Sequence, residues 1–201
     1  MKKIALISDN HSYAGEDTLK HLRGCDEIWH AGDIGSLESI KEIRDICTFR
    51  AVYGNIDGHA VRAEFPLNLS WECEGMNMFM THIGGYTPKY YKRVRKILEE
   101  TKPDLYICGH SHILKVMPDR DLDLLHMNPG AYGHHGFHKM RTILKFEIEN
   151  GAIENARVIE LGMRGKLSRR KSSKIDDGQP EDLFIRDPRA KRKSNKKPPT
   201  K

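Results

Sequence analysis

Short apolar runs alternate with amphipathic segments over the first third of the chain. Residues 4–8, 27–31 and 49–53 are apolar runs of strand length. Between them, residues 15–23 and 36–47 place apolar side chains at helical spacing. The order strand–helix–strand–helix–strand predicts parallel strands joined by right-handed crossovers.

The pattern then becomes rich in strands and predicts a mainly antiparallel second half. Turn residues at 74–75 and 150–151 separate neighbouring runs, as in β-hairpins. One helix is predicted at residues 88–101, with Pro88 in its first turn. The two halves together predict an α/β protein, a four-layer αββα sandwich of two mixed sheets flanked by helices. The remaining predicted strands are residues 67–73, 76–81, 104–108, 113–117, 122–127, 141–148 and 152–161.

The character of the sequence changes at Gly162. Residues 164–201 hold 14 Lys and Arg against 5 Asp and Glu, a net charge of +9, whereas the preceding residues carry −3. This segment has too few apolar side chains for burial to offset the entropy of ordering it. We therefore expect a folded domain at residues 1–162 and a basic, disordered C-terminal tail at residues 163–201.

The cysteines and the hydropathy of the sequence predict a soluble protein in a reducing compartment. The four cysteines form no CxxC pair and lie in or beside apolar stretches, which favours buried free thiols in a reducing environment. The first apolar run ends at Asp9 and is too short for a signal sequence. No stretch approaches the roughly twenty apolar residues of a membrane helix. We expect a soluble, cytoplasmic protein with no membrane partner.

Polar motifs follow five of the predicted strands. Carboxylate, imidazole and amide groups at the carboxyl edge of a sheet can hold metal ions, and this ligand mixture suits Mn²⁺, Fe²⁺, Zn²⁺ or Co²⁺. On an extended backbone, alternate residues such as Asp9 and His11, or His110 and His112, point the same way. The motifs are Asp9-Asn10-His11, Gly32-Asp33, Gly54-Asn55-Ile56-Asp57, Thr81-His82 and Gly109-His110-Ser111-His112.

This series of motifs resembles the calcineurin-like metallophosphoesterases, and most of all their small single-domain bacterial and archaeal phosphodiesterase branch. The resemblance covers about residues 1–160 and implies a four-layer fold with two metal ions. A first ion would be held by Asp9, His11, Asp33 and His112. A second ion, with Asp33 as the bridge, would be held by Asp33, Asn55, His82 and His110.

The resemblance also implies an activity, the hydrolysis of a small phosphoester. The expected reaction is that of a phosphodiesterase, with in-line attack by a hydroxide that bridges two divalent metal ions. Mn²⁺ is the expected metal, and Fe, Zn, Ni and Mg remain open.

The candidate catalytic residues are Asn55, Asp57 and His82. Larger family members have Gly-Asn-His and use that histidine as the proton donor, but this chain has Ile56 there. Asp57 either acts as the donor or orients a metal-bound histidine. His59 is either a donor or a solvated residue at the start of a short helix.

Other histidines have weaker signals. A loop carrying His134, His135 and His138 either contacts the substrate phosphate or is simply exposed. His21, His30 and His126 lie within predicted helices or strands, which indicates structural roles.

Two other functions remain open. A eukaryotic retromer subunit with this fold is an assembly platform, so the chain could be a catalytically silent scaffold, although every motif position carries a competent ligand. The basic tail could bind nucleic acid, but an incidental extension is favoured because Phe184 is its only aromatic residue. A homo-oligomer is neither shown nor excluded.

Overall fold

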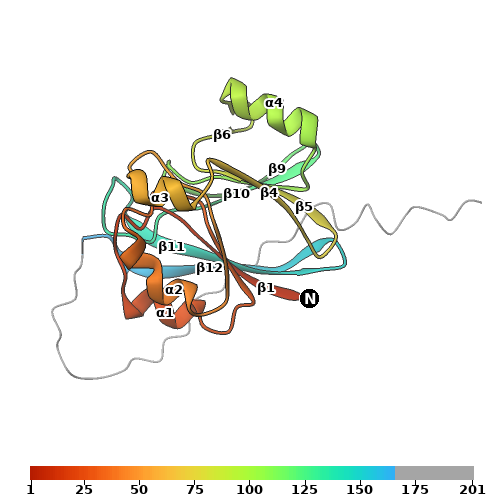
Figure 1. Cartoon of the computed structure of the whole chain (residues 1–201). Helices are drawn as coiled ribbons and strands as arrows, with labels where there is room; N and C mark the ends of the chain where they lie inside the picture. The colour runs from red at the N-terminus through yellow and green to blue at the C-terminus, as the bar shows by residue number, and fades with distance from the viewer. Residues whose placement is uncertain (166–201) are drawn as a thin grey trace, which may run out of the picture.

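Two five-stranded mixed sheets pack face to face, with helices on both outer surfaces. The computed structural model describes residues 1–165, so the predicted tail lies almost wholly outside the described residues. The strand orders are β12-β11-β1-β2-β3 and β4-β5-β8-β10-β9, with β6 and β7 forming a separate hairpin. Figure 1 shows α4 outside one sheet and α1 and α2 outside the other. The predicted αββα sandwich is confirmed.

The elements follow the expected runs closely. The helices are α1 (Glu16–Leu22), the 3₁₀ turn η1 (Leu37–Ile40), α2 (Lys41–Arg44), α3 (His59–Glu64) and α4 (Lys92–Thr101). The strands are β1 (Lys2–Ile7), β2 (Glu27–His30), β3 (Thr48–Ala51), β4 (Asn68–Cys73), β5 (Met76–Thr81), β6 (Gly85–Tyr86), β7 (Lys89–Tyr90), β8 (Leu105–Ile107), β9 (Leu114–Asp119), β10 (Leu124–Pro129), β11 (Met140–Glu149) and β12 (Ala152–Met163).

Each sheet has a parallel centre. β1, β2 and β3 run parallel, as predicted, and β11 pairs antiparallel with β1. In the second sheet β5, β8 and β10 are also parallel, while β4 and β9 close its edges antiparallel. The expectation of a mainly antiparallel second half holds for the pairs β4–β5, β9–β10 and β11–β12, whereas β5, β8 and β10 pair in parallel because α4 provides a crossover from β5 to β8. Five parallel strands of the two sheets therefore send their carboxyl ends into the motifs.

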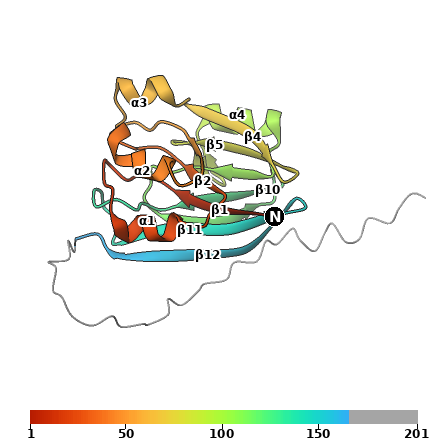
Figure 2. The ribbon, with the colours of Figure 1, turned by 60° about the horizontal axis from the view of Figure 1, so that its bottom comes forward.

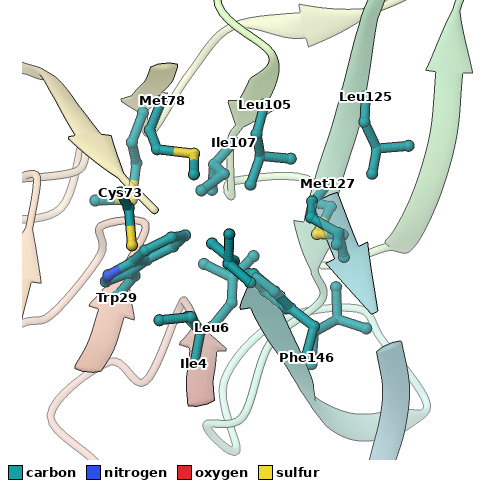
Figure 3. Close-up of a cluster of buried hydrophobic side chains, with 14 of the residues drawn as sticks. Ile4, Leu6, Trp29, Cys73, Met78, Leu105, Ile107, Leu125, Met127 and Phe146 are labelled. Carbon is teal, nitrogen blue, oxygen red and sulfur yellow. The ribbon is translucent and has the colours of Figure 1, made fainter. Parts of the chain in front are cut away.

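Three apolar clusters hold the four layers together. Between the sheets, Trp29 and Phe146 of the first sheet face Met78, Leu105 and Met127 of the second (Figure 3). A second cluster joins α1 and α2 to the first sheet, and a third joins α4 to the second. Full burial of each such large apolar side chain contributes about 1.5–3 kcal/mol. The motif loops are thus fixed to a well-packed frame.

Two predicted helices are shorter than expected. Residues 88–101 form a helix only from Lys92, because Pro88 and Tyr90 belong to the β6–β7 hairpin. The Tyr90 hydroxyl donates to Asp119 at 2.6 Å, and its ring packs on Tyr106, so tertiary contacts fix it outside the helix. Residues 36–47 contain η1 and one turn of α helix, since the Ser39 hydroxyl bonds back to the Ser36 carbonyl at 2.7 Å.

The folded part continues slightly past residue 162. β12 runs along the free edge of the first sheet to Met163 (Figure 2), and Arg164 bonds through its backbone N–H to the Lys139 carbonyl at 2.9 Å. The division into a domain and a tail stays a prediction. Within residues 1–165, none of the helices combines the length and the apolar character that crossing a membrane requires.

Candidate metal centre

The five motif loops meet at one edge of the sandwich, but not on extended backbone. Asp9, His11, Asp33, His110 and His112 have φ of 56°, 47°, 55°, 67° and 56°, in the left-handed region. The expectation that an extended chain aligns alternate side chains is therefore wrong. Tight left-handed turns bring the side chains together instead, at a cost of about 1–2 kcal/mol per residue. Such strain is typical of functional sites.

A first group of ligand atoms comes from both sheets. Asp9, His11, Asp33 and His112 each place one donor atom within 4.8 Å of the others. His112 Nε2 lies 3.1 Å from Asp9 Oδ1 and 3.3 Å from His11 Nε2. Asp9 is fixed through its other oxygen, which accepts the Ser8 hydroxyl at 2.6 Å. These four residues are the predicted first ligand set.

A second group shares Asp33 with the first. Asp33, His82 and His110 also place one atom each within 4.8 Å of one another. His82 Nε2 lies 3.1 Å from Asp33 Oδ1 and 3.2 Å from Asn55 Oδ1. The structure thus brings the seven predicted ligands into two adjoining clusters with one common carboxylate.

The hydrogen bonds around the site leave a nitrogen and an oxygen atom free to bind a cation. His82 Nδ1–H donates to the Ala31 carbonyl at 2.7 Å, which directs the Nε2 atom toward the carboxylates. Asp9 Oδ1 is buried without any hydrogen-bond donor among the described residues. An orphaned carboxylate oxygen that faces imidazole nitrogens costs free energy unless a cation joins them. Divalent ions that accept O and N ligands suit this donor set.

Burial and the neighbouring carboxylates shift the pKa values of the site histidines in opposite directions. Burial lowers the pKa of His11 and of His110, which favours the neutral form that binds a metal. Burial also opposes charge on His82, but its hydrogen bond to Asp33 and the nearby carboxylates outweigh this and raise its pKa. The pKa of Asp33 falls because the contact with His82 outweighs its burial. Asp9 and Asp33 therefore stabilise positive charge on the His82 imidazole itself.

His138 supports a ligand of the first group, which sequence reasoning missed. His138 Nε2 donates to the Gly133 carbonyl at 3.1 Å, so its Nδ1 is left as an acceptor. That atom lies 3.2 Å from His112 Nδ1, which then donates and leaves its Nε2 lone pair free for a cation. The only sequence signal for this support of His112 is the grouping of three histidines, His134, His135 and His138, in one loop. The ring centroids of His135 and His11 lie 4.8 Å apart. His134 donates through Nδ1 to the Arg164 carbonyl and contacts no candidate ligand by this bond.

Asp57 is buried beneath the Gly54–Asn55 turn. Its two oxygens accept the backbone N–H groups of Gly35 and Gly54, both at 2.6 Å. The carboxylate therefore ties two site loops together through backbone N–H groups, rather than orienting a candidate histidine ligand as one sequence alternative held. His59 is exposed at the start of α3.

Close packing explains two glycines of the motifs. A Cβ on Gly54 would overlap Asp33 Oδ1, and one on Gly109 would overlap the Ser8 hydroxyl. Any side chain at either position would push a predicted ligand out of place.

His30 and His126 are structural, as predicted. His30 is fully buried and holds the Asn10 side chain through Nε2 at 3.0 Å, and burial lowers its pKa to about 4. His126 stacks on Tyr106, and burial, aided by Lys115, lowers its pKa to about 3.

Comparison with known proteins decides the family. Residues 1–151 match the calcineurin-like phosphoesterase superfamily domain. The chain belongs to this superfamily. The match covers the whole ligand set and confirms the resemblance found in the motifs. The chain therefore carries a domain of this superfamily together with a cluster of residues able to bind metal.

Several relatives share its sequence or fold. The "Probable metallophosphoesterase" of Methanothermobacter thermautotrophicus is 29% identical over 133 residues, which are 64% of this chain and 76% of the relative. Vps29 of Entamoeba histolytica, solved with Zn²⁺, superposes with a TM-score of 0.64 at 16% identity, covering 79% of this chain and 92% of Vps29. An archaeal phosphodiesterase gives a TM-score of 0.60 at 23% identity, covering 79% of this chain and 99% of that one. The two solved structures support the fold alone.

Proposed function

We propose that the protein is a metal-dependent phosphodiesterase with two divalent cations at its centre. The observation that carries this proposal is the sharing of Asp33 between two adjoining ligand groups. Asp9, His11, Asp33 and His112 would hold one cation. Asp33, Asn55, His82 and His110 would hold the other.

The residues of this chain then act by binding and orientation. Bound divalent cations would supply Lewis-acid polarisation of the phosphoryl oxygens and a water of lowered pKa. Asn55 is exposed, and its side-chain NH₂ donates no hydrogen bond within residues 1–165, so it is available to a phosphoryl oxygen. His82 is fixed through Nδ1 by the Ala31 carbonyl, and Asp57 holds the turn that carries Asn55. Substrate is thus oriented by groups that need no rearrangement.

The proposal takes Mn²⁺ as the metal and a small phosphodiester as the substrate class. The mixed carboxylate and imidazole ligands support Mn²⁺, Fe²⁺ or Zn²⁺ over a site built for Mg²⁺ alone. The proposal takes a diester by analogy of fold, because one solved protein of the same fold is an archaeal phosphodiesterase. A cytoplasmic location, nucleic-acid binding through the tail and self-association remain predictions.

The test compares two aryl phosphates. Chelated protein is resupplied with Mn²⁺, and hydrolysis of bis-4-nitrophenyl phosphate and of 4-nitrophenyl phosphate is measured, with His110→Ala as the contamination control. Cleavage of the diester that requires Mn²⁺ and is lost in the variant supports the proposal. Faster cleavage of the monoester would indicate a phosphatase. Bound metal without hydrolysis of either compound would favour the scaffold alternative.

A further inference from the structure

A cleft beside the second ligand group carries cations without counter-charges. Its volume is about 450 Å³, and His82 and Asn55 form one wall. Arg62, Lys92 and Arg93 also line it, and no Asp or Glu of the described chain does. A cationic cleft that opens onto a phosphoester site attracts anionic groups.

Arg93, on the first turn of α4, is held only by neutral acceptors. Its guanidinium donates to Asn68 Oδ1 at 2.8 Å and to the Thr81 hydroxyl at 3.3 Å. It forms no ion pair among residues 1–165, whereas the arginines of the surface pairs do. The exposed guanidinium is therefore oriented but has no carboxylate partner among residues 1–165.

Arg62, on α3, is fixed in the same manner. Its Nε donates to the Asp57 carbonyl at 2.6 Å and its Nη2 to the Asn55 carbonyl at 3.2 Å. The guanidinium lies over the Tyr53 ring, 4.7 Å from the centroid. It too has no ion pair among the described residues, so a second oriented cation faces this cleft.

We propose that this cleft binds a second anionic group of the substrate, a phosphate or a carboxylate on its organic part. The inference rests on the proposed phosphodiesterase function and narrows its substrate class. Oriented guanidinium groups suit planar or tetrahedral oxyanions, and charge-assisted hydrogen bonds are stronger than neutral ones. Leu67, Ile83 and Tyr91 supply apolar wall for the organic part.

The test uses full-length, Mn²⁺-loaded protein and three matched substrates. Thymidine 5′-(4-nitrophenyl phosphate) is compared with its 3′-phosphate and its 3′-hemisuccinate, all read by nitrophenol release. We expect kcat/KM for the 3′-phosphate, or for both 3′-substituted substrates, to exceed that of the unsubstituted parent diester by about tenfold or more. A preference for the 3′-phosphate alone identifies a phosphate site, and a preference for both identifies a general anion site. Equal values for all three substrates would overturn the inference.

Two charge variants locate the preference. Arg93→Gln should lower the preference clearly, because Arg62 and Lys92 remain, and Arg93→Lys should keep most of it. The control is Arg120→Gln, which removes an exposed arginine of the β9–β10 turn that does not line the cleft. A preference that is as large in Arg93→Gln as in the wild type would contradict the assignment.

A binding measurement separates this inference from the proposed function. If none of the three substrates is hydrolysed, the phosphodiesterase proposal fails, and calorimetry then compares thymidine 3′,5′-bisphosphate with thymidine 5′-monophosphate. Tighter binding of the bisphosphate than of the monophosphate to the wild type, with a smaller difference in Arg93→Gln, supports the anion site. Equal affinities overturn it.

Discussion

His112 and His138 place their Nδ1 atoms 3.2 Å apart, and the Gly133 carbonyl fixes which of them donates. The hydrogen bond makes His138 a positioning residue for a ligand of the first group. It acts on the tautomer and the ring orientation of His112, the two properties on which metal affinity depends.

Removing this support should weaken metal binding. We expect His138→Ala to lower the affinity of the chelated protein for Mn²⁺ by about tenfold or more, measured by titration calorimetry. His138→Asn, whose side-chain oxygen can replace the Nδ1 acceptor, should recover part of the loss. His134→Ala is the matched control, because His134 bonds to the Arg164 carbonyl and not to a ligand. Unchanged affinity in His138→Ala would refute the positioning role.

Asp57 gives a second prediction. In Asp57→Asn an NH₂ group replaces one carboxylate oxygen and meets the N–H of Gly35 or Gly54. We expect unfolding free energy to fall by about 1–3 kcal/mol. We also expect kcat/KM for aryl and alkyl diesters to fall by the same factor, since the turn moves rather than a proton donor being lost. Asp121→Asn, in an exposed turn, controls for the charge change. A much larger loss on alkyl diesters would identify Asp57 as the donor.

Ile56 gives a third prediction, about the leaving group. Ile56 is 45% exposed next to Asn55, at the position where larger family members carry a proton-donating histidine. We expect the wild type to cleave aryl diesters more readily than matched alkyl diesters, which need a protonated leaving group. Ile56→His should then raise alkyl cleavage by about 10²-fold. Ile56→Gln tests whether polarity alone suffices, and equal wild-type rates on the matched pair would count against the argument.

His126 makes stability depend on pH. The pKa of His126 is about 3 in the folded protein, below its ordinary value of 6.5, so the unfolded chain binds a proton at His126 more readily than the folded protein does. The free energy of unfolding is therefore highest above pH 6.5 and decreases as the pH falls toward 3. Between pH 6.5 and pH 5 the loss is about 2 kcal/mol. Urea unfolding of His126→Phe, which keeps a ring against Tyr106, should show a smaller loss over this interval. An identical loss in variant and wild type would assign the effect to other groups.

Local sequence patterns predicted most of the strands and the positions of the candidate ligands along the chain, but not the backbone conformation of the loops that carry those residues. The apolar runs before Asp9, Asp33 and His82 marked real strands, and the motifs after them hold every member of the two ligand groups. The left-handed backbone at Asp9 and His11 was not predictable, because it depends on loops that pack only when both sheets meet.

Contacts between residues far apart in the sequence determine the features that local patterns did not predict. His138 meets His112 across 26 residues, and no spacing rule connects them. Tyr90 leaves the predicted helix because of contacts with Asp119 and Tyr106, which lie outside any local window. Tertiary packing overrides local propensity at such positions.

The ligand set crosses the boundary between the two sheets. Asp9 and Asp33 follow β1 and β2, whereas His82 and His110 follow β5 and β8. Each cation of the proposed centre would take ligands from both sheets and so cross-link the two layers. A cation present at a hundredfold excess over its Kd would add about 2.7 kcal/mol to the stability of the folded state. Loss of metal would then release the two sheets from each other at the edge where substrate enters, so that chelation would disable the chemistry and loosen the sandwich in a single event.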